Sequence, residues 1–376
     1  MNLSGEDRHN SSAVARRDIR DLTLDELESA AAEAGERPYR GRQIAHWLWR
    51  KGAESFDVMQ DLPAALRTAL AERFTLAPAN VAAVRRASDG TCKLLLRLAD
   101  GEAIETVIIP AGDRTTLCIS SQAGCAMGCE FCATARMGLH RNLTAAEIAA
   151  QVFAARRELN PGAQLTNYVF MGMGEPLANY PRLLGALTAM TAPWGMAISP
   201  RRITVSTVGI VPMMEKLLAE LPVNLAVSLH ATTDEARDRI APINRRYPLA
   251  ELIRACRRLP LKARSRITFE YVMLAGVNDT IDDARRLVKL LAPLRAKVNL
   301  IFFNPFAGSD LERSPRAAVE AFQAVLHRGN LTATIRESRG LDIAAACGQL
   351  YAEQHLPQDA GARDHERRAA QLGIQD

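Results

Sequence analysis

Residues 203–230 read ITVSTVGIVPMMEKLLAELPVNLAVSLH, a strand-like run, a helical pattern and a second strand-like run. The same alternation extends over residues 115–350. The other candidate strands are TLCIS (116–120), YVFMG (168–172), ITFEYV (267–272), VNLIFF (298–303) and TATIR (332–336). Such alternation predicts an α/β fold in which parallel strands and crossover helices form a full or partial (β/α) barrel.

The chain before this core divides into two further parts. Helical patterns begin with a capping box from Thr23 to Glu26. Three strand-like runs follow, separated by two Asp-Gly pairs, which are a strong hairpin signal. The expected parts are a disordered N-terminus (1–20), a helical domain (21–78), a β-meander linker (79–112), the core (113–350) and a polar C-terminal tail (351–376).

The composition indicates a globular protein that is only mildly basic. Of 376 residues, 48% are hydrophobic and 24% charged, and 47 Lys and Arg against 42 Asp and Glu give a net charge of +5. A nucleic-acid partner is permitted but not demanded by this balance. The sequence offers no membrane span or signal peptide, so we expect a cytoplasmic protein with no membrane contact. Nothing in it demands more than a monomer.

Three of the seven cysteines, Cys125, Cys129 and Cys132, lie in CAMGCEFC with C-x3-C-x2-C spacing. Three thiolates on one loop can hold three irons of a [4Fe–4S] cluster. The fourth iron is then open to a small chelating molecule such as S-adenosylmethionine (SAM). The alternative is a structural zinc site with Cys118 as the fourth ligand, although zinc sites usually pair ligands from two separate loops.

The motifs around these cysteines resemble one family. They are SSQAGCAMGCEFCAT, MGMGEPL, VSTVG, VSLHA, PINRRYPL, FNPF and DIAAACGQL. In this order they resemble the dual-specificity ribosomal and transfer RNA adenine-C2 methyltransferases of the radical SAM superfamily, over about residues 20–350. The adenine-C8 methyltransferases associated with antibiotic resistance share most of these motifs and remain an alternative. The helical module resembles the longer form typical of the C2 enzymes.

The resemblance implies a [4Fe–4S] cluster, two SAM molecules per turnover and a radical reaction. Adenine C2 lies between two ring nitrogens and is too electron-poor to attack the SAM methyl group as a nucleophile. The implied substrates are large-subunit (23S) ribosomal RNA at the peptidyl-transferase centre, before subunit assembly is complete, and transfer RNA next to the anticodon. The implied electron source is a reducing donor such as flavodoxin.

The resemblance also assigns roles to two cysteines and a glutamate. Cys347 matches the methyl carrier, which would take a methyl group as a thiolate. Cys118 matches the second cysteine, which releases the product by forming a transient disulfide with Cys347. Without the motifs, both cysteines would be interpreted as buried structural residues. Glu105 matches the proposed general base, where strand alternation alone predicts a solvent-facing carboxylate.

A further set of residues matches the family's SAM contacts. Gly174 would allow close backbone approach, and Glu175 would pair with the SAM ammonium group. The other matches lie at successive strand ends and are Ser206, Ser228, Leu229, His230 and Asn304. Any one of them alone would more often be an ordinary polar group of a core or loop.

The arginines around Trp47 and Trp49 suggest an RNA-facing surface by phosphate pairing and stacking. At least one of these tryptophans is expected in the core, and the arginines could equally be a solvated face. A non-catalytic, zinc-bearing RNA-binding module is the remaining alternative, but it does not account for the polar residues at the strand ends.

Overall fold

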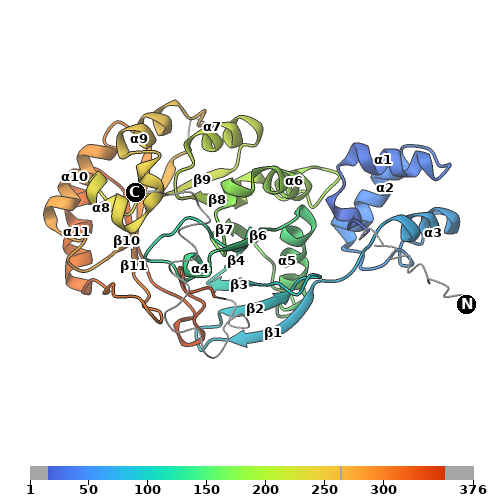
Figure 1. Ribbon diagram of the computed structural model, residues 1–376, viewed down its shortest axis with the longest axis horizontal. Coiled ribbons are helices and arrows are strands. Elements are labelled where there is room, and N and C mark those ends of the chain that lie inside the picture. The colour runs from blue at the N-terminus through green and yellow to red at the C-terminus, as the bar shows by residue number, and fades with distance from the viewer. Residues whose placement is uncertain (1–15, 263–264, 352–376) are drawn as a thin grey trace, which may run out of the picture. The chain divides into compact units, whose positions relative to one another are not determined.

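The structure is a computed structural model that describes residues 16–262 and 265–351 (Figure 1). The described chain forms two compact units. One is built from residues 16–78 with the short segments 144–146 and 185–197, and the other from the remainder. Most of the two expected tails, 1–15 and 352–376, lies outside the described residues.

The smaller unit is helical. Its elements are the 3₁₀ helix η1 (Ile19–Asp21), α1 (Leu24–Glu33), α2 (Arg40–His46), the π-helix η2 (Trp47–Lys51) and α3 (Ala64–Arg73). The capping box is confirmed, because the Thr23 side chain accepts from the Glu26 N–H and the Glu26 side chain accepts from the Thr23 N–H. Leu27, Ile44 and Leu66 are buried and form part of the core of this unit.

Residues 16–20 differ from the disorder expected of them. The Ile19 side chain is fully buried, and the Ile19 N–H donates to the Thr75 carbonyl at 3.0 Å. Asp18 caps η1 through the Arg20 N–H at 2.8 Å. A buried apolar side chain and several polar contacts therefore order a segment whose composition is that of a tail.

The larger unit contains a ten-stranded sheet in the order β1-β2-β3-β4-β7-β8-β9-β10-β11-β12. Its strands are β1 (Asn80–Arg86), β2 (Cys92–Arg97), β3 (Ala103–Ala111), β4 (Arg114–Cys118), β7 (Asn167–Phe170), β8 (Ile203–Thr207), β9 (Asn224–Ser228), β10 (Ile267–Met273), β11 (Ala296–Phe302) and β12 (Ala333–Arg336). From β4 to β12 every neighbouring pair is parallel, so the predicted partial barrel is confirmed. The first three strands are antiparallel hairpins, as the Asp-Gly pairs predict. Because β3 also pairs with β4, the meander continues the same sheet rather than linking separate bodies.

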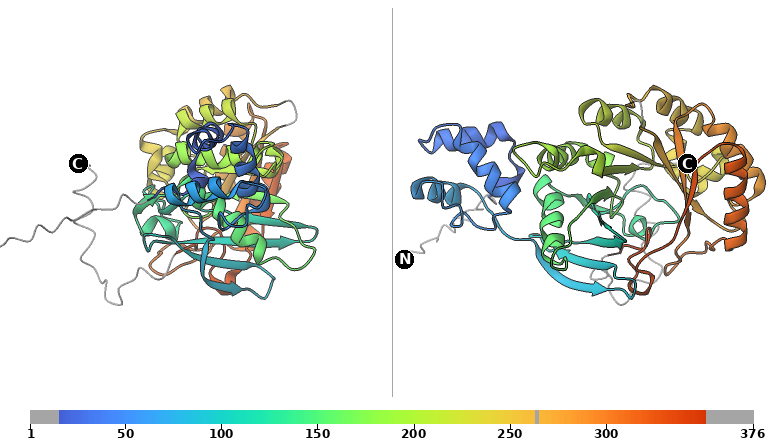
Figure 2. Two further views of the ribbon diagram at one scale, coloured as in Figure 1. Left: turned by 90° about the vertical axis from the view of Figure 1, so that its right-hand side faces the viewer. Right: turned by 180° about the vertical axis from the view of Figure 1, so that it is seen from behind.

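Helices follow the parallel strands. They are α5 (Ala145–Arg157), α6 (Tyr180–Thr191), α7 (Val211–Glu220), α8 (Asp234–Ile240), α9 (Leu249–Arg258), α10 (Ile281–Leu291) and α11 (Arg316–Arg328). Figures 1 and 2 show α7, α9, α10 and α11 along the outside of the curved sheet. Buried apolar residues such as Leu252, Leu287 and Phe322 form their inner faces, so their polar residues face outward. No helix in the described ranges is both long and apolar enough to cross a membrane.

Candidate active site

One cavity lies at the carboxyl ends of the parallel strands, the end at which barrels build active sites. Of the site residues predicted from sequence, all line it except Glu105, Cys118 and Leu229. Those that line it are Cys125, Cys129, Cys132, Gly174, Glu175, Ser206, Ser228, His230, Asn304 and Cys347. The fold thus brings residues separated by more than 200 positions to one surface.

The cysteine loop is held by a small hairpin that the sequence did not reveal. It lies between β5 (Gln122–Gly124) and β6 (Leu139–Asn142), which pair as a separate two-stranded sheet. Gly124 has φ +73°, and a Cβ at this position would lie 1.9 Å from the Gly138 carbonyl oxygen, so only glycine fits. The Cys125 N–H donates to the same oxygen at 2.8 Å. The strands therefore close the loop at its base.

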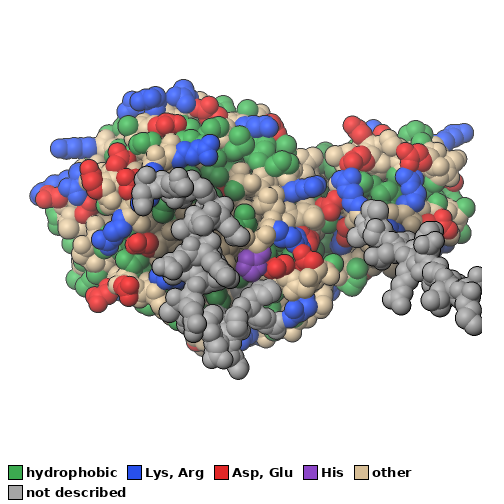
Figure 3. All heavy atoms as spheres, viewed as in Figure 1, with side chains coloured by type: hydrophobic (Ala, Val, Ile, Leu, Met, Phe, Trp, Pro, Cys, Tyr) green, Lys and Arg blue, Asp and Glu red, His purple; other side chains and the backbone are tan. Residues whose placement is uncertain are grey.

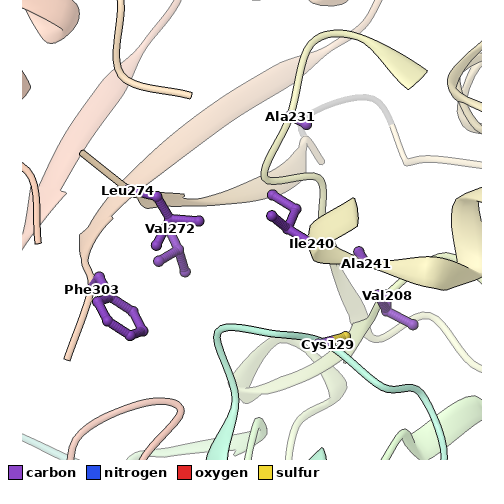
Figure 4. Close-up of a cluster of buried hydrophobic side chains, with 8 residues drawn as sticks. All are labelled: Cys129, Val208, Ala231, Ile240, Ala241, Val272, Leu274 and Phe303. Atoms are coloured by element: carbon purple, nitrogen blue, oxygen red, sulfur yellow. The ribbon is translucent and has the colours of Figure 1, made fainter. Parts of the chain in front are cut away.

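The surroundings of the cysteine loop are apolar. Figure 4 shows Cys129 on this loop near Val208 and Ala241, and these residues belong to one buried cluster with Ile240 and Phe303. The Glu130 N–H also donates to the Ile240 carbonyl at 3.1 Å, which ties the loop to the end of α8. Burial raises the pKa of the Cys125 thiol to about 12 and that of Cys129 well above its usual range. Bound iron would favour the thiolate forms instead.

The donor set fits an iron–sulfur cluster. Soft thiolates select iron–sulfur chemistry, and the three cysteines face one cavity from a single short loop. Each thiolate of such a cluster binds a different iron, so the three sulfurs need not meet at one point. In the described part of the chain no three His, Cys, Asp or Glu side chains are grouped to hold a single metal ion.

Glu175 is a buried carboxylate aligned by backbone groups. Its Oε1 accepts from the Leu177 N–H at 3.0 Å and its Oε2 from the Val208 N–H at 2.8 Å. Burial raises its pKa to about 7. The preceding Gly174 has φ +94°, and a Cβ there would lie 2.5 Å from the Gln122 Cβ, so the backbone passes too closely for any other residue. A cation reaching this carboxylate would stabilise its ionised form.

His230 faces the cavity as a neutral imidazole. Its Nδ1 accepts from the Val272 N–H at 3.1 Å, so the remaining proton belongs on Nε2, which is a donor. Burial lowers its pKa to about 3. The residue has φ +59°, an unusual conformation for a non-glycine residue. The centroid of its ring lies 4.3 Å from that of the Phe131 ring. The neighbouring Leu229 is fully buried away from the cavity.

Asn304 positions the segment that carries Cys347. Its Nδ2 donates to the Cys347 carbonyl at 3.1 Å, and its Oδ1 accepts from the Ser338 hydroxyl at 2.6 Å. The Ala133 N–H donates to the Gly348 carbonyl at 2.7 Å, so the same segment is joined to the cysteine loop. Cys347 keeps an exposed side, while the protein packed around its thiol raises its pKa to about 12.

Cys118 and Glu105 lie behind the cavity rather than on its surface. Cys118 is buried, and both burial and the nearby Cys347 raise its pKa. Glu105 is only 4% exposed, so the alternative of a solvent-facing carboxylate is wrong. It forms a buried ion pair with Lys93 at 2.8 Å and accepts from the Tyr351 N–H at 2.9 Å. All seven cysteines are free thiols in the structure.

The cavity also contains a carboxylate that the sequence reasoning missed. Glu270 lies in the middle of β10, is 5% exposed and accepts from the Asn299 side chain at 2.9 Å. The signal was available, because a lone acidic residue interrupts the apolar run ITFEYV. Burial raises the pKa of Glu270.

The tryptophans of the helical unit offer at most part of the stacking surface suggested by the sequence. Trp49 is 1% exposed and belongs to the core, as expected of at least one of the two. Trp47 is half-buried, its indole N–H donates to Asp61, and the Lys51 ammonium lies 3.4 Å from its ring centroid. One face of that ring is therefore already covered, and Trp49 cannot stack on RNA at all.

Comparisons with known proteins agree with this architecture. The radical SAM superfamily model matches residues 119–291, and the model of the ribosomal RNA large subunit methyltransferase N-terminal domain matches residues 17–76. A dual-specificity RNA methyltransferase RlmN from Anaeromyxobacter sp. (strain Fw109-5) is 53% identical over 90% of this chain and 91% of its own. Its counterpart from Geobacter sulfurreducens is 51% identical over 92% and 95%.

A solved structure is similar over the same range. The crystal structure of a radical SAM methyltransferase from Sphaerobacter thermophilus is 48% identical, with a TM-score of 0.85 over 89% of this chain and 99% of that one. The chain therefore belongs to the RlmN family of dual-specificity RNA methyltransferases, which are radical SAM enzymes that use a [4Fe–4S] cluster and SAM.

Proposed function

We propose that this enzyme methylates C2 of adenine in large-subunit (23S) ribosomal RNA at the peptidyl-transferase centre and in transfer RNA next to the anticodon. The observation that carries the proposal is one cavity lined by both the three-cysteine loop and Cys347. A cluster site alone would fit many radical SAM reactions. A further cysteine, exposed in the same cavity, adds a nucleophile that can carry a methyl group.

Cys125, Cys129 and Cys132 would hold the [4Fe–4S] cluster, leaving one iron for SAM. When bound, the cluster supplies the electron for reductive cleavage of SAM. The residues of this chain prepare that chemistry by excluding water, because Val208, Ile240 and Phe303 pack around the base of the loop. An apolar shell of this kind lowers the local dielectric constant and so affects the reduction potential of the cluster.

Glu175 would orient SAM through its ammonium group. Each oxygen of this carboxylate already accepts one backbone N–H, which fixes its position and leaves lone pairs for a cationic donor. Ser206, Ser228 and the Nε2–H of His230 would supply further hydrogen bonds from neighbouring strand ends. The contacts of Asn304 with Cys347 suggest that this asparagine also positions the methyl carrier.

Cys347 would act as the methyl carrier and Cys118 as the residue that releases the product. Cys347, as a thiolate, would take the methyl group from one SAM, and this S-methyl group would lose a hydrogen atom to the 5′-deoxyadenosyl radical formed from a second SAM. Its carbon would then bond to C2, with loss of the C2 proton and return of one electron to the cluster. Attack by the Cys118 thiolate on the Cys347 sulfur would form a disulfide and break the carbon–sulfur bond. The electron pair of that bond would stay on the carbon, which would take up a proton and become the methyl group of adenine. Glu105 would accept the C2 proton. Its ion pair with Lys93, at 2.8 Å, would hold the carboxylate in position for that step.

The proposal also covers the RNA substrate, the electron donor and the state of the enzyme in the cell. The ribosomal substrate would be RNA before subunit assembly is complete, and electrons would come from a reducing donor such as flavodoxin. The enzyme would act as a cytoplasmic monomer. The helical unit would contact RNA mainly through shape and hydrogen bonds, with exposed side chains such as Tyr39 and Arg37.

Nucleoside analysis tests the position of methylation. Ribosomal and transfer RNA from wild-type and deletion strains would be digested and compared by mass spectrometry. We expect 2-methyladenosine to disappear from both RNA classes in the deletion strain and to return with the intact gene. Loss of 8-methyladenosine instead would identify the C8 enzyme and reject the proposed regiochemistry.

A further inference from the structure

The positive charge of the chain is concentrated in one segment. Residues 245–297 contain 13 Lys and Arg against five Asp and Glu, a net charge of +8, whereas the whole chain has only +5. The rest of the protein is therefore slightly acidic. A local excess of this size on an otherwise balanced chain is the usual electrostatic mark of a polyanion-binding surface.

These cations all face solvent. Every Lys and Arg of the segment in the described part of the chain is exposed, whereas two of its five acidic residues, Glu270 and Asp283, are buried. Figure 3 shows Lys and Arg side chains gathered at the upper left, over α9 and α10. The exposed side chains of this segment are therefore even more positive in sum than the sequence count indicates.

The centre of this surface is a groove between α9 and α10. Arg254, Arg257 and Lys289 line it, over an apolar floor that includes Ile253 and Leu290. Within the described residues, none of these three cations forms an ion pair with a carboxylate. Their positive charges therefore line the groove without a paired carboxylate in the described part of the chain. We call Arg254, Arg257 and Lys289 the basic groove.

Other cations on the same two helices are already paired. Arg258 bonds Glu215 at 2.7 Å and Arg285 bonds Asp282 at 2.8 Å. The absence of such pairs inside the groove is therefore not a general property of these two helices.

Stabilisation of the helix ends explains only part of this pattern. Arg257 and Lys289 lie in the last turns of α9 and α10, where a cation typically contributes about 0.3–1 kcal/mol. Arg254 lies further inside α9 and has no such role. Stabilisation of helix ends also does not explain why cations from two helices line the same groove.

We propose that the basic groove binds the phosphodiester backbone of the substrate RNA outside the catalytic cavity. The inference rests on RNA being the substrate. Arginine pairs with phosphate through two parallel hydrogen bonds, and such contacts position an RNA without reading its sequence. Clustered cations without partners match a regularly charged chain, whereas an acidic protein would have to present carboxylates at matching positions.

The groove extends the RNA-binding surface away from the reacting nucleotide. Helix α9 leads into β10 and α10 leads into β11, so Arg257 and Lys289 lie toward the amino ends of these strands. The cavity lies at the opposite, carboxyl ends. Contacts that do not depend on the local base sequence would suit an enzyme that acts on two different classes of RNA.

The test is a triple substitution, Arg254→Gln, Arg257→Gln and Lys289→Gln, in the full-length holoenzyme. Arg182→Gln, Arg201→Gln and Arg202→Gln form the matched control, because they remove three equally exposed cations elsewhere on the chain. Binding of transfer RNA and of a ribosomal RNA fragment is measured across a series of salt concentrations. SAM affinity, iron content and thermal stability are measured in parallel.

We expect the groove variant to bind RNA about tenfold more weakly and its log–log salt slope to become shallower by about 2, since each phosphate contact contributes about 0.7. The control slope should stay within about 0.5 of the wild-type value, and SAM affinity should not change in either variant. Equal losses in both variants would overturn the proposal in favour of a general effect of net charge. An unchanged salt slope in the groove variant would also overturn the proposal, because the groove would then make no phosphate contact. This holds even if the same variant had lost binding to an acidic protein. Wild-type protein that binds no RNA would reject the proposed function itself.

Discussion

The helical unit and the basic groove both present arginines at helical surfaces, but they differ in how that charge is balanced. Residues 21–78 contain seven Lys and Arg against ten Asp and Glu, a net charge of −3. Arg42 bonds Glu28 at 3.1 Å, and Arg40 lies 3.5 Å from Glu36. The three cations of the basic groove, in contrast, form no such pair among the described residues. We therefore expect the electrostatic contact with RNA at the basic groove rather than at the helical unit.

If the groove binds RNA by charge, this role is separate from the chemistry of the catalytic cavity, and variants of the cavity should leave RNA binding unchanged. The largest effect should come from the cluster ligands. Replacing Cys125, Cys129 or Cys132 with Ala removes one of three thiolates, so bound iron and SAM cleavage should be lost entirely. RNA affinity and its salt slope should stay at wild-type values. Iron assays measure cluster binding, and RNA titrations measure RNA affinity. A steep fall in RNA affinity would show that RNA binding depends on the cluster site.

The next effect distinguishes the two cysteines outside the cluster loop. Cys347→Ala removes the proposed methyl carrier, so no bond to RNA should form. Cys118→Ala leaves the carrier intact but removes its attacker, so a covalent protein–RNA adduct should accumulate through Cys347. Reductant should not release this thioether. Denaturing gels with and without ribonuclease, followed by peptide mass spectrometry, detect the adduct. Equal adduct in both variants would show that these roles are wrongly assigned.

A smaller effect is expected at Glu175. Glu175→Gln keeps the shape of the side chain but removes the charge that would pair with the SAM ammonium group. It also leaves one of the two backbone N–H groups, of Leu177 or Val208, without its acceptor. Loss of a charge-assisted hydrogen bond of about 1.5–3 kcal/mol weakens SAM binding roughly tenfold to one-hundredfold. Calorimetric titration with SAM measures this change. The salt slope of RNA binding should be unaffected, and a shallower slope would mean that cavity and groove are not independent.

The fold could be predicted largely from local patterns. Alternating apolar runs found all seven parallel strands, and the Asp-Gly pairs found both hairpins before them. The β5–β6 hairpin could not be found this way, because its strands are three and four residues long and are separated by the cysteine loop. Ile19 shows the same limit, since a single buried side chain leaves no periodic signal.

Much of the candidate site could be predicted because its motifs are contiguous in the sequence. What a residue contacts across the fold could not be predicted. The ion pair of Glu105 with Lys93 depends on the register of β2 and β3, which places Leu95 opposite Glu105. Asn304 was expected to contact SAM, yet both polar atoms of its side chain bond protein groups, Cys347 and Ser338. Glu270 was overlooked because one acidic residue in a strand does not alter an apolar average.

The smallest expected effect returns to the helical unit and tests the comparison directly. Arg37→Gln, Arg42→Gln and Arg50→Gln together remove three exposed positive charges, the same change as in the groove variant. Because Arg42 is already paired with Glu28 and the unit is net acidic, few counterions should be released by RNA at this surface. The salt slope should therefore change by no more than about 0.7, the value of one phosphate contact.

Stability should change little in this variant, because an exposed ion pair such as Arg42–Glu28 contributes only about 0.2–1 kcal/mol. Thermal unfolding provides that control, and RNA titration across salt concentrations provides the measurement. A salt slope shallower by about 2 would contradict this expectation, because it would assign the electrostatic RNA contact to the helical unit. A small slope change with a clear loss of affinity would instead support binding by this unit through shape and hydrogen bonds, leaving the charge-driven contact to the groove between α9 and α10.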